Sequence, residues 1–312
     1  MRILVTGATG FLGGAVCRAL SARGHEVVAA IRTPSAILPP GLETRIVGAI
    51  DATTQWSAAV AGIDVVMHLA GRAHVMHDTQ SDPLAAFRAV NRDGTLTLAR
   101  ACVDAGVKRL VFVSSIKVNG EATPPGMAYT AADAPAPGDA YGRSKHEAEE
   151  GLRSLASATG LEVVIVRPPL IHGPGAKGNL ASLMKAIARG LPLPLGCIIN
   201  RRSLVGKANL ADALSFLADH PAARGKTFLI SDGEDISSPD LVRHLATAMG
   251  RPARLLPVPV VLLRLAGAML GRRGAIDRLT GSLVVDDTPL RHLGWRPVES
   301  LDQGLRAMVG QD

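Results

Sequence analysis

The sequence has few cysteines and few aromatic residues, and each shortage excludes a class of protein. The 312 residues include three cysteines, Cys17, Cys102 and Cys197, which are far apart and lack metal-ligand spacing. We therefore expect neither a disulfide framework nor a zinc site, and the composition fits a reduced, cytoplasmic protein. Aromatic residues make up 3% of the chain, which is too few for the stacking surface of a single-strand nucleic-acid binder.

The sequence also has only a modest excess of positive charge and no long apolar run. The net charge is +7, but the arginines are scattered, so we expect an anionic small substrate and no nucleic acid as partner. The most apolar segment, Leu255–Leu270, contains two prolines and an arginine and is too short to span a bilayer. It predicts a buried or dimer-forming helix, with peripheral membrane contact as the alternative. The first residues, MRILVTG, already follow a strand pattern, so neither a signal peptide nor an integral membrane segment is expected.

Short apolar runs alternate with helical spacing through the first 170 or so residues. The runs are continuously apolar, which is typical of parallel strands covered on both faces; they are RILVTG, HEVVAAI, TRIVGAI, IDVVMHLA, KRLVFVSS and LEVVIVRP. Helical spacing covers Phe11–Arg23, Asp82–Ala105 and Tyr141–Thr159. This order predicts an α/β fold with a Rossmann-like, doubly wound parallel sheet.

The pattern changes after Pro168, where glycine and proline become frequent. We predict a dinucleotide-binding domain over residues 1–172 and a smaller, helix-rich substrate lobe over 173–312. Helices are expected at Leu180–Arg189, Leu210–Ala218 and Pro239–Met249. The run KTFLISD (Lys226–Asp232) is expected to return to the first sheet, so that the two domains interleave.

A glycine-rich turn, TGATGFLG, follows the first strand and opens a helix. Glycines there let the backbone approach a pyrophosphate, which the positive end of the helix then stabilises. The turn therefore predicts dinucleotide binding, through Gly7, Thr9, Gly10, Phe11, Leu12 and Gly13.

The end of the second strand bears on which dinucleotide is bound. NAD sites usually place an acid there for the ribose hydroxyls, but this chain reads AAIRTPS and has no acid until Glu43. Arg32, assisted by Ser35, could pair with a 2′-phosphate instead, although a solvated arginine at a strand end is the alternative. We favour NADP(H), with NAD(H) as the other possibility.

A tyrosine and a lysine lie four residues apart in YGRSK, so a helix would present Tyr141 and Lys145 on one face. The ammonium is expected to lower the pKa of the phenol and prepare it for proton transfer. Ser115, at the end of the preceding strand, could hydrogen-bond the same substrate oxygen.

Together with HLAG, Asn91 and RPPLIHGPG, these motifs resemble the extended short-chain dehydrogenase/reductases of the nucleotide-sugar epimerase/dehydratase family. The resemblance implies that Ser115, Tyr141 and Lys145 are catalytic and that Tyr141 and Lys145 also hold the cofactor. It adds further cofactor contacts at Ile50, Leu69, Ala70, Gly71, Asn91 and Pro168. Asp51 would support that site from behind or cap a turn.

The same resemblance implies a UDP-sugar substrate and a homodimer formed through Asp82–Ala105 and Tyr141–Thr159. Its substrate contacts would be Ser114, Lys117, Asn179, Leu180, Leu193, Arg202 and Arg278. More narrowly, SSIKVNGE, GLPLPLG and RLTGSL are similar to bacterial O-antigen enzymes. Those include 4-keto reductases that make UDP-N-acetyl-quinovosamine or -fucosamine, and UDP-glucose 4-epimerase homologues.

Ile116 and Lys117 help to choose the reaction. By resemblance, 4,6-dehydratases carry carboxylates at these positions and decarboxylases carry one at the first, so both reactions are disfavoured here. The absence of an acid at the end of the second strand favours NADP and therefore net reduction. We expect the substrate to be a UDP-4-keto-6-deoxy-N-acetylhexosamine, with UDP-hexose 4-epimerisation as the alternative reaction. A reductase of a non-nucleotide ketone and a non-catalytic NADPH sensor are further alternatives.

Two features near the site stay open. Lys117 either adds charge near the developing alkoxide or pairs with Glu121 or another carboxylate. The Gly/Pro-rich segment 120–138 is expected to form a mobile flap. No metal is expected, because the histidines form no ligand set; those considered are His68, His74, His77 and His172.

Overall fold

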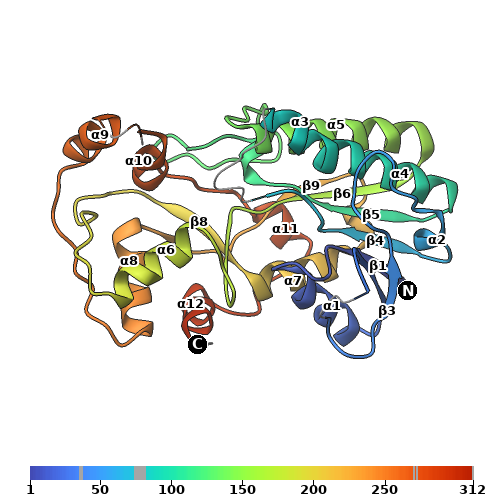
Figure 1. The fold of residues 1–312 in the computed structure, drawn as a ribbon, viewed down its shortest axis with the longest axis horizontal. Coiled ribbons are helices and arrows are strands. Elements are labelled where there is room, and N and C mark those ends of the chain that lie inside the picture. The colour runs from blue at the N-terminus through green and yellow to red at the C-terminus, as the bar shows by residue number, and fades with distance from the viewer. Residues whose placement is uncertain (35–37, 74–81, 270, 272, 311–312) are drawn as a thin grey trace.

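The computed structural model describes residues 1–34, 38–73, 82–269, 271 and 273–310. Over those residues, seven parallel strands form one sheet in the order β3-β2-β1-β4-β5-β6-β9 (Figure 1). The doubly wound parallel sheet is thereby confirmed. The strands are β1 (Arg2–Thr6), β2 (Glu26–Ile31), β3 (Glu43–Ile46), β4 (Val65–His68), β5 (Arg109–Val113), β6 (Glu162–Arg167) and β9 (Thr227–Leu229).

Helices cover both faces of this sheet (Figure 1). One face packs on α1 (Gly13–Ala22), α7 (Lys207–Leu217) and α11 (Thr288–His292). The other face packs on α2 (Ser57–Val60), α4 (Thr95–Asp104) and α5 (Ala140–Thr159), with α3 (Pro83–Arg88) beside α5. Except in the edge strand β3, which is largely exposed, the strand interiors are almost completely buried on both sides, which explains why they read as continuously apolar runs.

A smaller lobe is built on a second sheet with the order β10-β8-β7. Its strands are β7 (Leu170–His172), β8 (Arg202–Gly206) and β10 (Asp235–Ile236). Helices α6 (Asn179–Ala188), α8 (Ser238–Ala248) and α12 (Leu301–Val309) share an apolar core with it. Helices α9 (Val260–Met269) and α10 (Arg273–Thr280) lie at the far end of this lobe (Figure 1).

The chain after residue 173 is not confined to the smaller lobe. β9 pairs with β6 as the seventh strand of the main sheet, which confirms the predicted return of Lys226–Asp232. Helix α7 also belongs to the first core, where it packs on α1. The boundary at 172/173 remains a prediction.

The apolar segment Leu255–Leu270 was predicted to form a buried or dimer-forming helix; over its described residues it contains α9, which is buried on one side only. Within α9, Leu263 and Gly267 are buried, whereas Val261, Leu262, Leu265 and Met269 are exposed. Across the described ranges, none of the helices combines the length and apolarity needed to cross a membrane.

Candidate active site

The glycine-rich turn lies between β1 and α1 and is closely packed against its own backbone. Gly7 has a φ of 70°, and a Cβ there would come within 2.8 Å of the Ala70 nitrogen. A Cβ on Gly13 would lie 2.2 Å from the Gly7 oxygen, so both positions require glycine. Within the described part of the chain, no side chain caps the first turn of α1, and that turn contains no acid. The uncapped N–H groups and the close backbone fit a dinucleotide pyrophosphate.

The segment Leu69–Gly71 follows β4 and lies beside this turn. The Ala70 nitrogen donates to the Thr6 hydroxyl over 3.2 Å. His68, directly before the segment, is buried between the hydroxyls of Thr6 and Thr95 at 2.7 and 2.9 Å. Burial lowers the pKa of His68 to about 3, so the ring is neutral and holds strand β4 in place.

Asn91 joins the segment after β4 to the helix of the predicted catalytic residues. Its Oδ1 accepts from the Arg72 nitrogen at 2.8 Å, and its Nδ2 donates to the Ser144 hydroxyl at 2.9 Å. Asn91 lies in a π-helical stretch, Ala89–Gly94, between α3 and α4. The helical spacing predicted over Asp82–Ala105 is therefore confirmed, with a π-helical stretch between the two α-helices.

The structure brings Ser115, Tyr141 and Lys145 together. Asp139 accepts a hydrogen bond from the Gly142 nitrogen at 2.7 Å and so starts α5 immediately before Tyr141. The Tyr141 phenol hydrogen-bonds the Ser115 hydroxyl, which follows β5. Lys145 donates to the Val113 carbonyl at 2.9 Å and lies 4.4 Å from the centre of the Phe112 ring.

The expected lowering of the tyrosine pKa by the lysine is wrong for the chain alone. Burial raises the pKa of Tyr141 to about 12, although the hydrogen bond with Ser115 opposes that rise. Burial also lowers the pKa of Lys145 to about 8. The physical reason is that the ammonium is held on a carbonyl and an aromatic ring, so that desolvation decides both values.

Lys117 forms ion pairs with carboxylates, which was one of its two predicted roles. Its ammonium contacts the Asp139 carboxylate and lies 3.5 Å from Glu121. Asp139 is the residue that caps α5, and its negative charge raises the pKa of Tyr141. We infer that Lys117 fixes this cap and offsets its charge. Ile116 is buried, with 4% of its surface exposed.

Removing the Lys117 charge should therefore raise the pKa of Tyr141, because an unpaired Asp139 carboxylate disfavours the phenolate. Asp139→Asn should lower the pKa of Tyr141. Adding Lys117→Met to the Asp139→Asn variant should then leave that pKa unchanged. The chain has two tyrosines, so Tyr141 is the one tyrosine that remains in a Tyr129→Phe variant. In that variant, ¹⁹F NMR of incorporated 3-fluorotyrosine reports the titration of Tyr141. An unchanged titration in Lys117→Met would show that the lysine does not act on the phenol.

A buried ion pair that sequence reasoning missed supports the same strand end. Glu149, four residues after Lys145 on α5, accepts from the Arg167 guanidinium at 2.9 and 2.6 Å. Arg167 also donates to Asn119 Oδ1 at 2.9 Å. The Ser114 hydroxyl donates to Glu149 at 2.5 Å, so Ser114 contacts α5 where a substrate contact was predicted.

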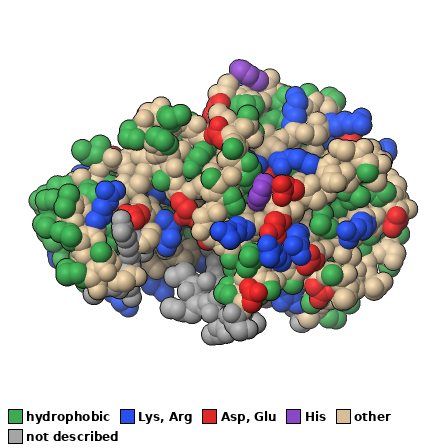
Figure 2. Space-filling model, turned by 90° about the horizontal axis from the view of Figure 1, so that it is seen from above, with side chains coloured by type: hydrophobic (Ala, Val, Ile, Leu, Met, Phe, Trp, Pro, Cys, Tyr) green, Lys and Arg blue, Asp and Glu red, His purple; other side chains and the backbone are tan. Residues whose placement is uncertain are grey.

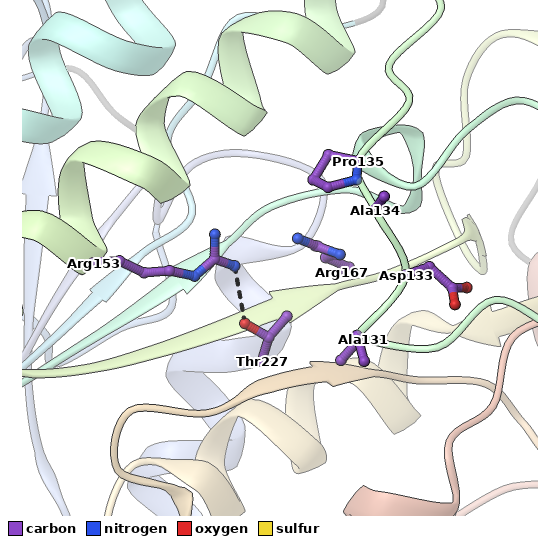
Figure 3. A pocket seen from close by; sticks show the side chains of 8 residues that line it. Ala131, Asp133, Ala134, Pro135, Arg153, Arg167 and Thr227 are labelled. Atoms are coloured by element: carbon purple, nitrogen blue, oxygen red, sulfur yellow. Dashed lines mark hydrogen bonds between the residues drawn. The ribbon is translucent and has the colours of Figure 1, made fainter.

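A cavity of about 440 Å³ borders this ion pair (Figure 3). Arg153 of α5 and Arg167 of β6 point toward one another across it, while the Asp133 carboxylate is turned away. Arg153 bonds Thr227 at 3.2 Å and Glu149 at 2.8 Å. Among the residues that the structure describes, none of the predicted catalytic or substrate-binding side chains lines this cavity, so it is separate from the predicted sugar site.

The segment 120–138, predicted as a mobile flap, is tied down at several points. The Thr123 and Tyr129 nitrogens donate to the carbonyls of Ser282 and Val284, each at 2.8 Å. Asn119 donates to the Thr130 carbonyl at 2.8 Å. These bonds join the segment to the smaller lobe and to the turn after Ser115, which limits its freedom to move.

The remaining predicted cofactor residues are placed as follows. Arg32 is exposed directly after β2, whereas Ser35 lies outside the described residues, as do His74 and His77. Ile50 is half-buried beneath Gly94, where a Cβ would come within 2.6 Å of it. The Pro168 carbonyl accepts from the Ile116 nitrogen at 3.0 Å. Asp51 caps a turn by accepting from the Thr53 nitrogen at 2.7 Å.

The predicted substrate residues of the smaller lobe are less closely grouped. Asn179 is exposed at the start of α6, whereas Leu180 is buried in the lobe's core. Leu193 exchanges backbone hydrogen bonds with Arg254 and Leu256. Arg202 donates to the carbonyls of Arg278 and Gly281 at 2.8 and 3.0 Å, so these two arginine positions are adjacent. His172 pairs with Asp232 at 2.6 Å inside the protein.

Comparisons with known proteins agree with this geometry. The family described as the NAD dependent epimerase/dehydratase family matches residues 3–231. A Vibrio cholerae protein named UDP-glucose 4-epimerase is 44% identical over 306 residues, which cover 97% of this chain and 93% of that protein. The 2-alkyl-3-oxoalkanoate reductase of Stenotrophomonas maltophilia is 31% identical over an alignment that covers 99% of this chain and 98% of that protein. The solved UDP-glucose 4-epimerase of Thermus thermophilus, a complex with NAD, superposes with a TM-score of 0.80 at 25% identity, covering 99% and 98% of the two chains.

Proposed function

The chain belongs to the NAD dependent epimerase/dehydratase family, and we propose that it interconverts epimers at C4 of a UDP-linked hexose. The observation that carries the proposal is the Ser115–Tyr141 hydrogen bond beside Lys145, at the sheet edge that also holds the glycine-rich turn. The similarity to a protein named UDP-glucose 4-epimerase favours epimerisation, which the sequence predicts as the alternative, over 4-keto reduction.

In the proposed mechanism, Tyr141 exchanges the proton of the C4 oxygen. Ser115 holds that oxygen and, through its hydrogen bond, lowers the pKa of the phenol. Lys145, whose ammonium donates to the Val113 carbonyl, would hold the cofactor ribose. When bound, the nicotinamide would supply the hydride chemistry: acceptance of a hydride from C4 and return of that hydride to either face of the sugar. Because Ile116 is apolar and Lys117 is paired with Asp139, neither offers the carboxylate that dehydration needs.

The fit of a dinucleotide rests on the glycine-rich turn and on the uncapped start of α1. We propose that Gly7 to Gly13, Leu69 to Gly71 and Asn91 surround it. NADP preference is a further proposal, supported by the exposed Arg32 after β2.

Arg32→Asp should change the cofactor preference. The substitution removes the proposed partner of the 2′-phosphate, so affinity for NADPH should fall by about tenfold relative to NADH. Fluorescence titration of the reduced cofactors measures this ratio. Arg189→Asp, the same charge change on an exposed residue of the other lobe, is the control. An unchanged ratio in Arg32→Asp would reject the proposed phosphate contact.

Net reduction of a UDP-4-keto-6-deoxy-N-acetylhexosamine is the second candidate, favoured by the absence of an acid between Ile31 and Glu43. A reductase must release and renew its cofactor, whereas an epimerase returns the hydride to the same sugar. One experiment separates the two. The purified protein is given UDP-glucose, UDP-galactose or the keto sugar with NADPH, and products are followed by NMR and at the absorbance of the reduced cofactor. Interconversion without net cofactor oxidation is expected; oxidation matched to keto-sugar loss would favour the second candidate.

We also propose that the protein is a cytoplasmic homodimer formed through the helices of residues 82–105 and 141–159. Both helical regions lie on the same face of the main sheet, where α3 and α4 each pack against α5. Charge reversal on the exposed surface of these helices, followed by light scattering, tests the dimer.

A further inference from the structure

Helix α9 has two faces of different character. Leu263 and Gly267 face the core of the smaller lobe. On the opposite side, Val261, Leu262, Leu265 and Met269 are 67%, 55%, 56% and 82% exposed. Since each helical residue turns the chain by about 100°, these four side chains fall within an arc of about 100°. They form one continuous apolar stripe, which we call the α9 stripe.

The α9 stripe lies at the tip of the smaller lobe, at the end of the molecule farthest from the main sheet (Figure 1). Figure 2 shows hydrophobic side chains gathered at that end. Leu256, just before the helix, adds another exposed apolar side chain at 45%. A solvent-facing stripe of this kind at a tip marks an interaction surface.

The sequence around the α9 stripe is strongly basic. Residues 250–281 contain six arginines and one aspartate, so this tenth of the chain carries five of its seven net positive charges. The positive charge of the chain is therefore concentrated in this segment and is not evenly scattered. Arg264 is the one charged residue of α9 itself, and it lies 3.6 Å from Asp277 of α10.

We propose that the α9 stripe docks on an anionic phospholipid membrane and that arginines near it in the sequence, which include the exposed Arg251, Arg254 and Arg264, bind its headgroups. An apolar stripe with a basic surround is the pattern of helices that lie in the membrane interface. A second copy of the chain fits less well, because a twofold interface would bring two arginine-rich segments together with one aspartate each. Anionic lipid supplies the missing negative charge. The proposal is independent of the reaction at C4.

Vesicle co-sedimentation tests the proposal with the full chain. Vesicles of phosphatidylcholine alone are compared with vesicles of equal parts phosphatidylcholine and phosphatidylglycerol. Binding to the anionic vesicles should be about tenfold tighter and should weaken as salt is raised. Equal binding to both kinds of vesicle, or none to either, would overturn the proposal.

Variants assign the binding to the α9 stripe. Leu262→Asp/Leu265→Asp should lower binding to anionic vesicles by about tenfold or more. Leu262→Ser/Leu265→Ser, which adds no charge, should lower it as well. The control Ile46→Asp/Val298→Asp adds the same charges at residues that are 61% and 60% exposed and lie outside α9, and it should bind more tightly than the first variant. Circular dichroism checks that each variant is folded. If light scattering shows that the α9 variants break a dimer while vesicles bind none of the proteins, a second copy is the occupant and the membrane proposal is wrong.

Discussion

Tyr141→Phe is expected to lower kcat by about a thousandfold, because the substitution removes the group that exchanges the proton of the C4 oxygen. The change is confined to one hydroxyl. The ring would keep its edge contact with Phe87, whose centre lies 5.9 Å away, and α5 would keep its Asp139 cap. Turnover of the UDP-sugar, followed by NMR, measures the loss. Dinucleotide titration should show a cofactor affinity within a few-fold of the parent, because the ring and Lys145 remain.

Tyr129→Phe is the matched control. Tyr129 is the second of the two tyrosines and donates to the Ala122 carbonyl at 2.7 Å, so the same atom is removed at a site without a proposed catalytic role. Its kcat should stay within a few-fold of the parent. A Tyr141→Phe enzyme that retained a tenth of the parental kcat would assign the proton exchange to another group.

Glu149→Gln is expected to lower the free energy of unfolding by about 3 kcal/mol, because it leaves the buried Arg167 guanidinium without its counter-charge. Glu149 is 0% exposed, and its carboxylate also accepts hydrogen bonds from the Ser114 hydroxyl and the Arg153 guanidinium. Urea denaturation followed by circular dichroism measures the change. Glu150→Gln, on the next and exposed position of α5, should change stability by less than about 1 kcal/mol.

The cost of Glu149→Gln should also depend on pH. Burial raises the pKa of Glu149, but the ion pair with Arg167 and the hydrogen bonds together outweigh burial and hold that pKa below its usual range. An unfolded glutamate has a pKa of about 4.3. The stabilisation is therefore complete above about pH 4.3 and is lost as pH falls through the lower, folded pKa. The stability difference between parent and variant should shrink in that acidic range, and a difference that grew with acidification would contradict the assigned ion pair.

The parts of the fold that follow from local pattern could be predicted from sequence. The parallel strands were identified because both of their faces are buried, and α5 was placed to within one residue because Tyr141 to Lys145 begins a regular spacing. The adjacency of Ser115 and Tyr141 followed from a known motif.

The contacts that depend on distant residues could not be predicted in the same way. Glu149 and Arg167 meet across α5 and β6, and nothing in the spacing of two charged residues identifies such a pair. Lys117 looked like a potential substrate contact until the structure placed Asp139 beside it. Apolar periodicity in α9 predicted a helix but not which side would stay uncovered, since that depends on the lobe packed beneath it.

The position of β9 has a consequence for how the protein is made. During synthesis, β1 to β6 leave the ribosome with the edge of β6 uncovered, because its partner begins at Thr227. An uncovered parallel edge invites pairing with other chains. The nascent protein must therefore keep that edge from association until the whole of the β7–α7 region has emerged, and a chain terminated before residue 227 should be aggregation-prone even though its cofactor turn is complete.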